Sequence, residues 1–140
     1  MSEVSVDVES EMSHAIASDA DVVLVRQAVR ALAVDAKLSL VDQTKLVTAA
    51  SELARNTLVY GGGGTVTVEL IRAGLRRGVR AAFVDRGPGI PDLTLALTDG
   101  WTSGSGMGLG LSGTKRLVDE FHIDTAPGAG TRVRILKWKR

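Results

Sequence analysis

The sequence predicts a mixed α/β fold, an α+β sandwich in which helices pack on one face of a β-sheet. Three observations support this prediction. Several segments alternate apolar and polar residues, as half-buried strands do. Two longer segments repeat apolar residues every three or four positions, as amphipathic helices do. The resulting order is a strand, two helices, two strands, a loop-rich helical insert, a helix and two strands, which suits helices over one sheet.

The first half of the chain contains the two long helices. Val4, Val6 and Val8 alternate with polar residues and predict a strand. A helix is predicted over residues 18–33, because capping residues precede an apolar stripe. A second helix is predicted from near Asp42 to Gly61. Its expected buried residues are Leu46, Val47, Ala50, Leu53, Ala54, Thr57 and Leu58.

The second half contains most of the strands. They are predicted over residues 65–71, 78–85, 122–127 and 131–138, with a turn at 128–130 between the last two. A short helix is predicted over 92–99 and a longer one over 111–121. Because the sequence shows no internal repeat and no linker, residues 1–140 are expected to form one domain.

The composition restricts the class of protein. Of 140 residues, 44% are hydrophobic but only 4% aromatic, so the core is expected to be aliphatic. The absence of cysteine excludes disulfides and thiolate metal sites and is compatible with a reducing cytoplasm. No apolar run approaches the roughly 20 residues of a membrane helix, and the N-terminus does not resemble a secretory signal. His14 and His122 are isolated, which argues against a histidine metal site.

Charge is unevenly distributed around a net value of +1. The first 21 residues carry acidic side chains and no Lys or Arg, whereas the last ten are basic. A basic tail can bind nucleic acid. Arg132 and Arg134 alternate with Val133 and Ile135, however, and a strand with one face in water explains this pattern better. We therefore expect neither a nucleic-acid partner nor a membrane.

Glu52 and Asn56 are the first pair with chemical potential. They lie four residues apart on the second predicted helix, so they project from the same face. An amide oxygen is a hard ligand suited to Mg²⁺, and a carboxylate beside it can accept a proton from a hydroxyl. An exposed helix face with a Glu52–Arg55 ion pair would explain the same residues.

The loop after the strand at 78–85 is the second candidate. Asp85 ends an apolar strand, where its carboxylate can accept hydrogen bonds from an amine such as that of adenine. Gly87 and Gly89 remove side chains where a flat base would lie. A plain strand-to-helix turn uses the same residue types.

The third candidate is the glycine-rich segment of residues 101–113. Gly106, Gly108 and Gly110 precede a predicted helix, and unhindered backbone N–H groups at such a position bind phosphates. The segment matches neither a P-loop nor a first βα-turn fingerprint. Taken alone it could be a mobile surface loop; a linker has no second domain to connect.

In combination and in this order, these elements resemble the nucleotide-binding (GHKL, Bergerat) fold of gyrase, Hsp90, histidine kinases and MutL, which has a mainly antiparallel sheet. "ELARN" resembles the N box, which implies Glu52 as general base and Asn56 as magnesium ligand. "DRGPG" resembles the G1 box, which implies Asp85 on the adenine amino group. "GSGMGLGL" resembles the ATP lid, and "GT" at Gly130–Thr131 the last adenine-side element. The implied nucleotide-binding residues are Asn56, Asp85, Gly87, Gly89, Gly104, Gly106, Met107, Gly108, Leu109, Gly110 and Thr131.

Over nearly the whole chain, the sequence resembles the stand-alone anti-sigma-factor-type serine kinases, and within them the RsbT-type switch kinases of the bacterial stressosome. The stretch "SGTKRLVDEF" favours that branch. The resemblance implies ATP with Mg²⁺, a serine substrate on a STAS-domain protein, a PP2C-type phosphatase as a later partner, and a cytoplasmic location. A sigma factor is the partner of the sister branch. Ser112 stands where proline is expected, and the glycines at 61–64 are expected near the partner-facing edge.

Two functions remain open at this point. One is a protein serine kinase in which Glu52 accepts the proton of the incoming hydroxyl. The other is a module that uses ATP to sequester a sigma factor or phosphatase with little catalysis. A base beside the γ-phosphate favours the kinase, and the absence of a transducer domain disfavours a detached ATPase of a larger machine.

Overall fold

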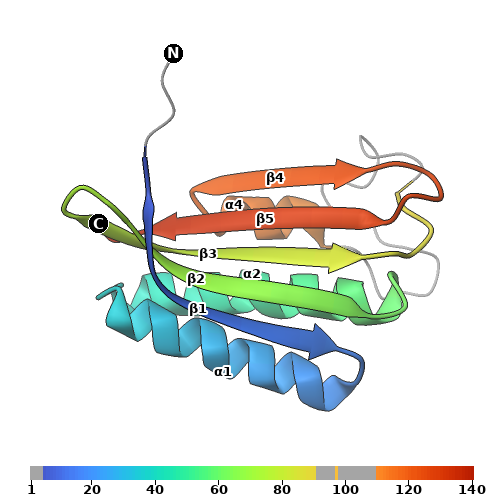
Figure 1. The fold of residues 1–140 in the computed structure, drawn as a ribbon, viewed down its shortest axis with the longest axis horizontal. Helices are drawn as coiled ribbons and strands as arrows, with labels where there is room; N and C mark the ends of the chain where they lie inside the picture. Colours follow the sequence, from blue (N-terminus) through green and yellow to red (C-terminus); the bar gives the residue numbers. More distant parts are fainter. Residues whose placement is uncertain (1–4, 91–96, 98–109) are drawn as a thin grey trace.

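A computed structural model describes residues 5–90, 97 and 110–140. It confirms a mixed α/β fold with helices on one face of a sheet (Figure 1). The elements are β1 (Asp7–Ile16), α1 (Asp19–Asp35), α2 (Leu40–Val59), β2 (Gly64–Ala73), β3 (Arg76–Asp85), α4 (Leu111–Arg116), β4 (Glu120–Thr125) and β5 (Thr131–Trp138). The five strands form one sheet in the order β1-β2-β3-β5-β4, and each neighbouring pair is antiparallel.

Serine caps start both long helices. The Ser18 hydroxyl accepts from the Asp21 N–H at 3.4 Å before α1, and the Ser39 hydroxyl accepts from the Asp42 N–H at 3.1 Å before α2. The two helices lie side by side, because each presents an apolar stripe to the sheet (Figure 1). No helix among the described residues combines the length and apolarity that a membrane crossing requires.

The core lies between the helices and the inner face of the sheet. Because strand residues alternate between faces, β2, β3 and β5 each contribute every second side chain to it. The core is aliphatic as predicted, and Phe83 is the one fully buried aromatic side chain in the described part. The strand residues of the core are Val66, Val68, Leu70, Val79, Ala81, Phe83, Val133 and Ile135.

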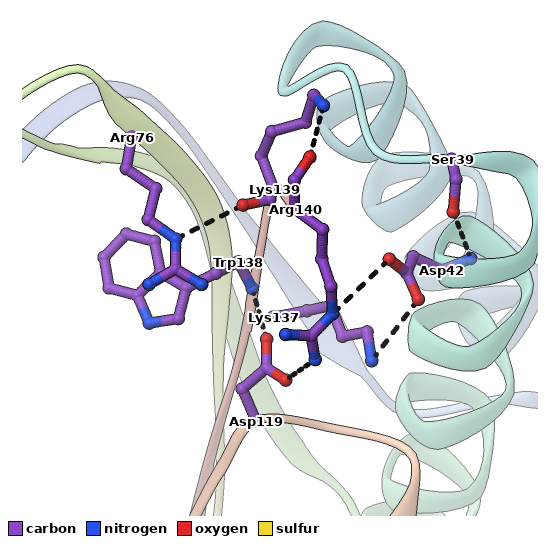
Figure 2. A network of polar contacts seen from close by, with 8 residues as sticks. All are labelled: Ser39, Asp42, Arg76, Asp119, Lys137, Trp138, Lys139 and Arg140. Atoms are coloured by element: carbon purple, nitrogen blue, oxygen red, sulfur yellow. Dashed lines mark hydrogen bonds and ion pairs between the residues drawn. The ribbon is translucent and has the colours of Figure 1, made fainter.

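A polar network closes the sheet where β5 ends (Figure 2). Lys137, whose side chain is only 4% exposed, lies 3.6 Å from Asp42 in the first turn of α2. Arg140 contacts both Asp42 and Asp119, and Asp119 also accepts from the Trp138 N–H at 2.7 Å. The network therefore joins the start of α2, the segment after α4 and the end of the chain.

Two element predictions are wrong. The strand predicted around Val4–Val8 runs instead from Asp7 to Ile16 and includes His14, which pairs with Val66. The helix predicted over 111–121 stops at Arg116. Beyond Arg116, the Asp119 N–H donates to the Leu136 carbonyl, and pairing with β5 starts at Glu120. Residues with a helical pattern are therefore part of the sheet instead, because strand pairing outweighs the local helical preference. Except for Leu97, which packs against the core, the helix predicted over 92–99 lies outside the described residues.

Candidate nucleotide-binding and catalytic site

One pocket lies where the end of α2 meets the ends of the central strands. Predicted site residues from distant segments line it together: Asn56 from α2, Asp85 from the end of β3 and Thr131 from the start of β5. The antiparallel register explains this meeting, because Asp85 pairs with Thr131. The remaining lining residues are Leu53, Thr57, Tyr60, Phe83, Ile90, Leu111, Ile123 and Val133. A mostly apolar pocket with a few polar groups is the usual form of a ligand site.

Asp85 is held by backbone on several sides. One of its carboxylate oxygens accepts from the Gly87 N–H at 2.9 Å. Gly61 packs so closely that a Cβ on it would collide with the Asp85 carboxylate, and a Cβ on Gly87 would lie 2.7 Å from the Gly61 Cα. Gly64 is the β-sheet partner of Asp85.

Gly61 was therefore missed as a site residue. The sequence contained a signal, four consecutive glycines directly after α2, but the prediction assigned them to a partner-facing edge. In the structure, Gly61 and Gly64 lie against Asp85 and Val84. Tyr60, beside them, lines the pocket and was also missed.

The loop after Asp85 is fastened to the turn between β4 and β5. The Gly128 N–H donates to the Pro88 carbonyl at 2.7 Å, and the Ile90 N–H donates to the Thr125 hydroxyl at 2.8 Å. Gly89, at φ +76°, faces the Ala126 carbonyl so closely that no Cβ would fit. The predicted reason for Gly89, space for a base, is therefore incomplete, since its own turn and contact require glycine.

The Thr125 hydroxyl connects the loop after Asp85 with the start of β5. Its hydroxyl donates to the Gly130 carbonyl at 3.1 Å and lies 3.0 Å from the hydroxyl of Thr131, its partner across β4 and β5. Gly130, at φ +78°, packs against the Asp85 carbonyl. Thr125 was also missed, because its role depends on loops that only the fold brings together.

Glu52 does not itself line this pocket. It sits one turn before Asn56 on α2, and a Cβ on Gly110 would be 2.8 Å from its Cγ. Burial raises the pKa of the Glu52 carboxyl, and the positive charge of Arg55 opposes part of that effect. No ion pair within 4.0 Å joins Glu52 to Arg55 in the described part of the chain. A carboxylate with a raised pKa is better suited to accept a proton.

The residues present fit a magnesium nucleotide. The described residues contain no group of three His, Cys, Asp or Glu side chains that could hold a metal by itself. Mg²⁺ bound through few protein ligands together with substrate phosphates needs no such group, and Asn56 supplies one hard oxygen at the pocket wall. Asp85 supplies the acceptor that an exocyclic amine requires.

The predicted lid is described only at its end. Gly104, Gly106, Met107, Gly108 and Leu109 lie outside the described residues. Gly110 has φ +59° and precedes α4, so it adopts a conformation that favours glycine. Its contact with Glu52 places the end of the lid segment beside the predicted base.

The pocket lined by Asn56, Asp85 and Thr131 lies between the helices and one end of an antiparallel sheet of an α/β sandwich, where the predicted nucleotide site was expected. The family model for histidine kinase-, DNA gyrase B- and HSP90-like ATPases matches residues 41–140, and the chain belongs to this family.

Similar proteins of known function indicate which kind of protein within this ATPase family the chain resembles. The serine/threonine-protein kinase RsbT of Bacillus subtilis (strain 168) is 39% identical over 125 residues, which cover 89% of this chain and 94% of that protein. The anti-sigma F factor of Thermoanaerobacter sp. (strain X514) is 26% identical, covering 81% of this chain and 82% of that protein. The relationship to RsbT confirms the prediction of an ATP-using serine/threonine protein kinase.

The fold has a solved counterpart. The crystal structure of the RsbU and RsbW domains of Rv1364c from Mycobacterium tuberculosis matches 94% of this chain with a TM-score of 0.66 and 22% identity. This chain spans only 33% of that chain. The likeness confirms the predicted sandwich fold.

Proposed function

We propose that this protein is a switch-type serine kinase that transfers the γ-phosphate of ATP to a serine of a STAS-domain protein. The observation that carries the proposal is the position of Glu52, which lies beside Gly110 and one helical turn from Asn56. A module that only binds ATP has no need of a base there. The 39% identity to a serine/threonine-protein kinase supports the same reaction.

The chemistry follows from these positions. The acceptor serine oxygen forms a bond to the γ-phosphorus while the bond from that phosphorus to the bridging oxygen breaks, and ADP leaves. Glu52 accepts the hydroxyl proton and Asp85 binds the adenine amine, and Asn56 would hold Mg²⁺, which would supply positive charge to the phosphates. Phosphoryl transfer depends mainly on the positioning of the reactants. The loop after Asp85 contributes to that positioning, because hydrogen bonds from the Gly87 and Ile90 N–H groups hold it in place.

The downstream steps belong to the same proposal. In a stressosome-type pathway in the cytoplasm, phosphorylation releases the kinase from its STAS partner, and the free kinase activates a PP2C-type phosphatase. The 26% identity to an anti-sigma F factor supports a second candidate function, that of a protein that sequesters a sigma factor.

The test uses γ-labelled ATP, Mg²⁺ and purified STAS-domain proteins from the same genome. We expect wild type to produce an acid-stable, alkali-labile phosphoserine, and Glu52→Gln to slow transfer by about 10²-fold or more while fluorescent ATP still binds. Glu11→Gln, an exposed Glu on β1, is the matched control and should transfer normally. Nucleotide binding without transfer to any STAS protein would favour the sequestering module.

A further inference from the structure

A surface groove separates the two long helices on their solvent side. Arg26 and Arg30 of α1 line it together with Thr44, Thr48, Glu52 and Arg55 of α2. It continues along α1 past Val23, which is 47% exposed. α1 and α2 run in opposite directions (Figure 1). Because α1 ends at Asp35 and α2 starts at Leu40, Arg30 lies nearer to the start of α2 and Arg26 lies farther along α2.

The groove carries an excess of positive charge. Three arginines line it against one carboxylate, that of Glu52. Within the described residues, none of the three has an acidic partner within 4.0 Å. Arg26 and Arg30 are also four residues apart on one helix, and like charges at this spacing repel each other and destabilise the helix. Arg26 and Arg30 therefore have no ion pair among the described residues that would offset their mutual repulsion.

Glu52 belongs to both the groove and the nucleotide end. It lines the groove, and its Cγ also lies beside Gly110, next to Leu111 of the pocket. A hydroxyl whose proton passes to Glu52 must reach that carboxylate from outside the pocket, because ATP occupies the inside. The groove is the surface that leads there.

We infer that this groove binds an acidic segment of the acceptor protein, with its carboxylates on Arg26 and Arg30 and its serine at Glu52. The inference rests on the proposed kinase function and names the chemistry of its substrate. Charge-assisted pairs between arginine and carboxylate are strong and geometrically specific.

The groove also sets a spacing. From Thr44 to Glu52 the rise along α2 is about 12 Å. An extended chain covers that distance in about three or four residues. The carboxylate on Arg30 therefore lies about three or four positions from the acceptor serine, and the carboxylate on Arg26, which is one helical turn or about 6 Å nearer Glu52, lies about two positions from it.

The first experiment measures phosphorylation of a purified STAS-domain protein at increasing concentrations. Arg26→Glu and Arg30→Glu should each raise KM about tenfold or more, leave kcat within about twofold, and leave the affinity for a fluorescent ATP analogue unchanged. Lys45→Glu is the matched control, since Lys45 is exposed on α2 but does not line the groove. An unchanged KM for both arginine variants, or an equal rise for Lys45→Glu, would overturn the inference.

The second experiment does not depend on catalysis. Fluorescence anisotropy compares two labelled decapeptides with one serine, one carrying Asp and Glu two and four residues away and one carrying Lys at both positions. Wild type should bind the acidic peptide at least tenfold more tightly, and the Arg26→Glu/Arg30→Glu variant should lose that preference. Equal binding of the peptides by wild type would overturn the groove assignment. Failure of every STAS protein as a substrate, with the peptide preference intact, would overturn the proposed kinase function alone.

Discussion

The two ends of the sheet are closed in opposite ways. At the pocket end, backbone meets backbone or carboxylate through Gly61, Gly87 and Gly130. At the other end, the long side chains of Lys137 and Arg140 reach acidic partners (Figure 2). Glycine contacts bring segments together without filling the space beside them, whereas long side chains fill it. The chain thus keeps its candidate ligand pocket at one end and the buried Lys137–Asp42 ion pair at the other.

The largest expected effect lies at the end of the sheet where Lys137 and Arg140 contact acidic partners. Lys137→Met should lower the free energy of unfolding by about 2–4 kcal/mol, because Asp42 would remain nearly buried with only Arg140, 4.0 Å away, as a cation. Urea denaturation measures this loss. The affinity for a fluorescent ATP analogue should not change, since Lys137 lies about 20 Å along β5 from Thr131.

The double variant Asp42→Asn/Lys137→Met tests whether the pair is the cause. Because it removes both charges, its loss should be smaller than the sum of the two single losses. Additive losses would show that Asp42 and Lys137 are not energetically coupled, and a change in ATP affinity would show that the two ends of the sheet are not independent.

The next effect lies at the pocket end and is one of binding. Gly61→Ala should weaken ATP binding at least tenfold, because its Cβ would lie 2.6 Å from the Asp85 Cβ and Asp85 would have to move. Gly62→Ala is the matched control. Gly62 has φ +75° and open space around it, so alanine there should cost about 1–2 kcal/mol of stability and no affinity. Equal affinities of the two variants would refute the role of Gly61 in holding Asp85.

Local patterns predicted much of this arrangement. One helix fixes the spacing of Glu52 and Asn56. Asp85 ends one apolar strand and Thr131 starts another, and the resemblance assigned both residues to the adenine side of the site, where the structure pairs them. The roles of these residues remain predictions, and the structure shows only that they lie together.

Contacts between distant segments were not predictable in the same way. Gly61 needs glycine because of Asp85, and Thr125 matters because Ile90 reaches it, and neither reason is visible in the neighbouring sequence. The end of α4 at Arg116 was mispredicted for a related reason, since pairing with β5 outweighs a local helical pattern. The groove between α1 and α2 likewise exists only once the helices pack.

The smallest expected effect concerns the stability cost of the predicted base. Burial raises the pKa of Glu52, so its ionised form is less favourable in the folded than in the unfolded chain. That cost is absent below the ordinary value of 4.5 and appears as the pH rises through the raised pKa of the folded state. Glu52→Gln should therefore raise Tm slightly at pH 7, by about 1–2 °C, because solvent still screens the half-buried carboxylate.

The pH dependence separates this cause from simple packing. The gain in Tm of Glu52→Gln over wild type should shrink toward zero as the pH falls below 4.5, where wild-type Glu52 is neutral as well. Glu11→Gln, at an exposed position, should show no gain at either pH. A gain of equal size at pH 4 and pH 7 would mean that the amide merely packs better against Gly110. A gain confined to high pH would mean that the pocket end keeps an unfavourable charge where the other end pairs its own.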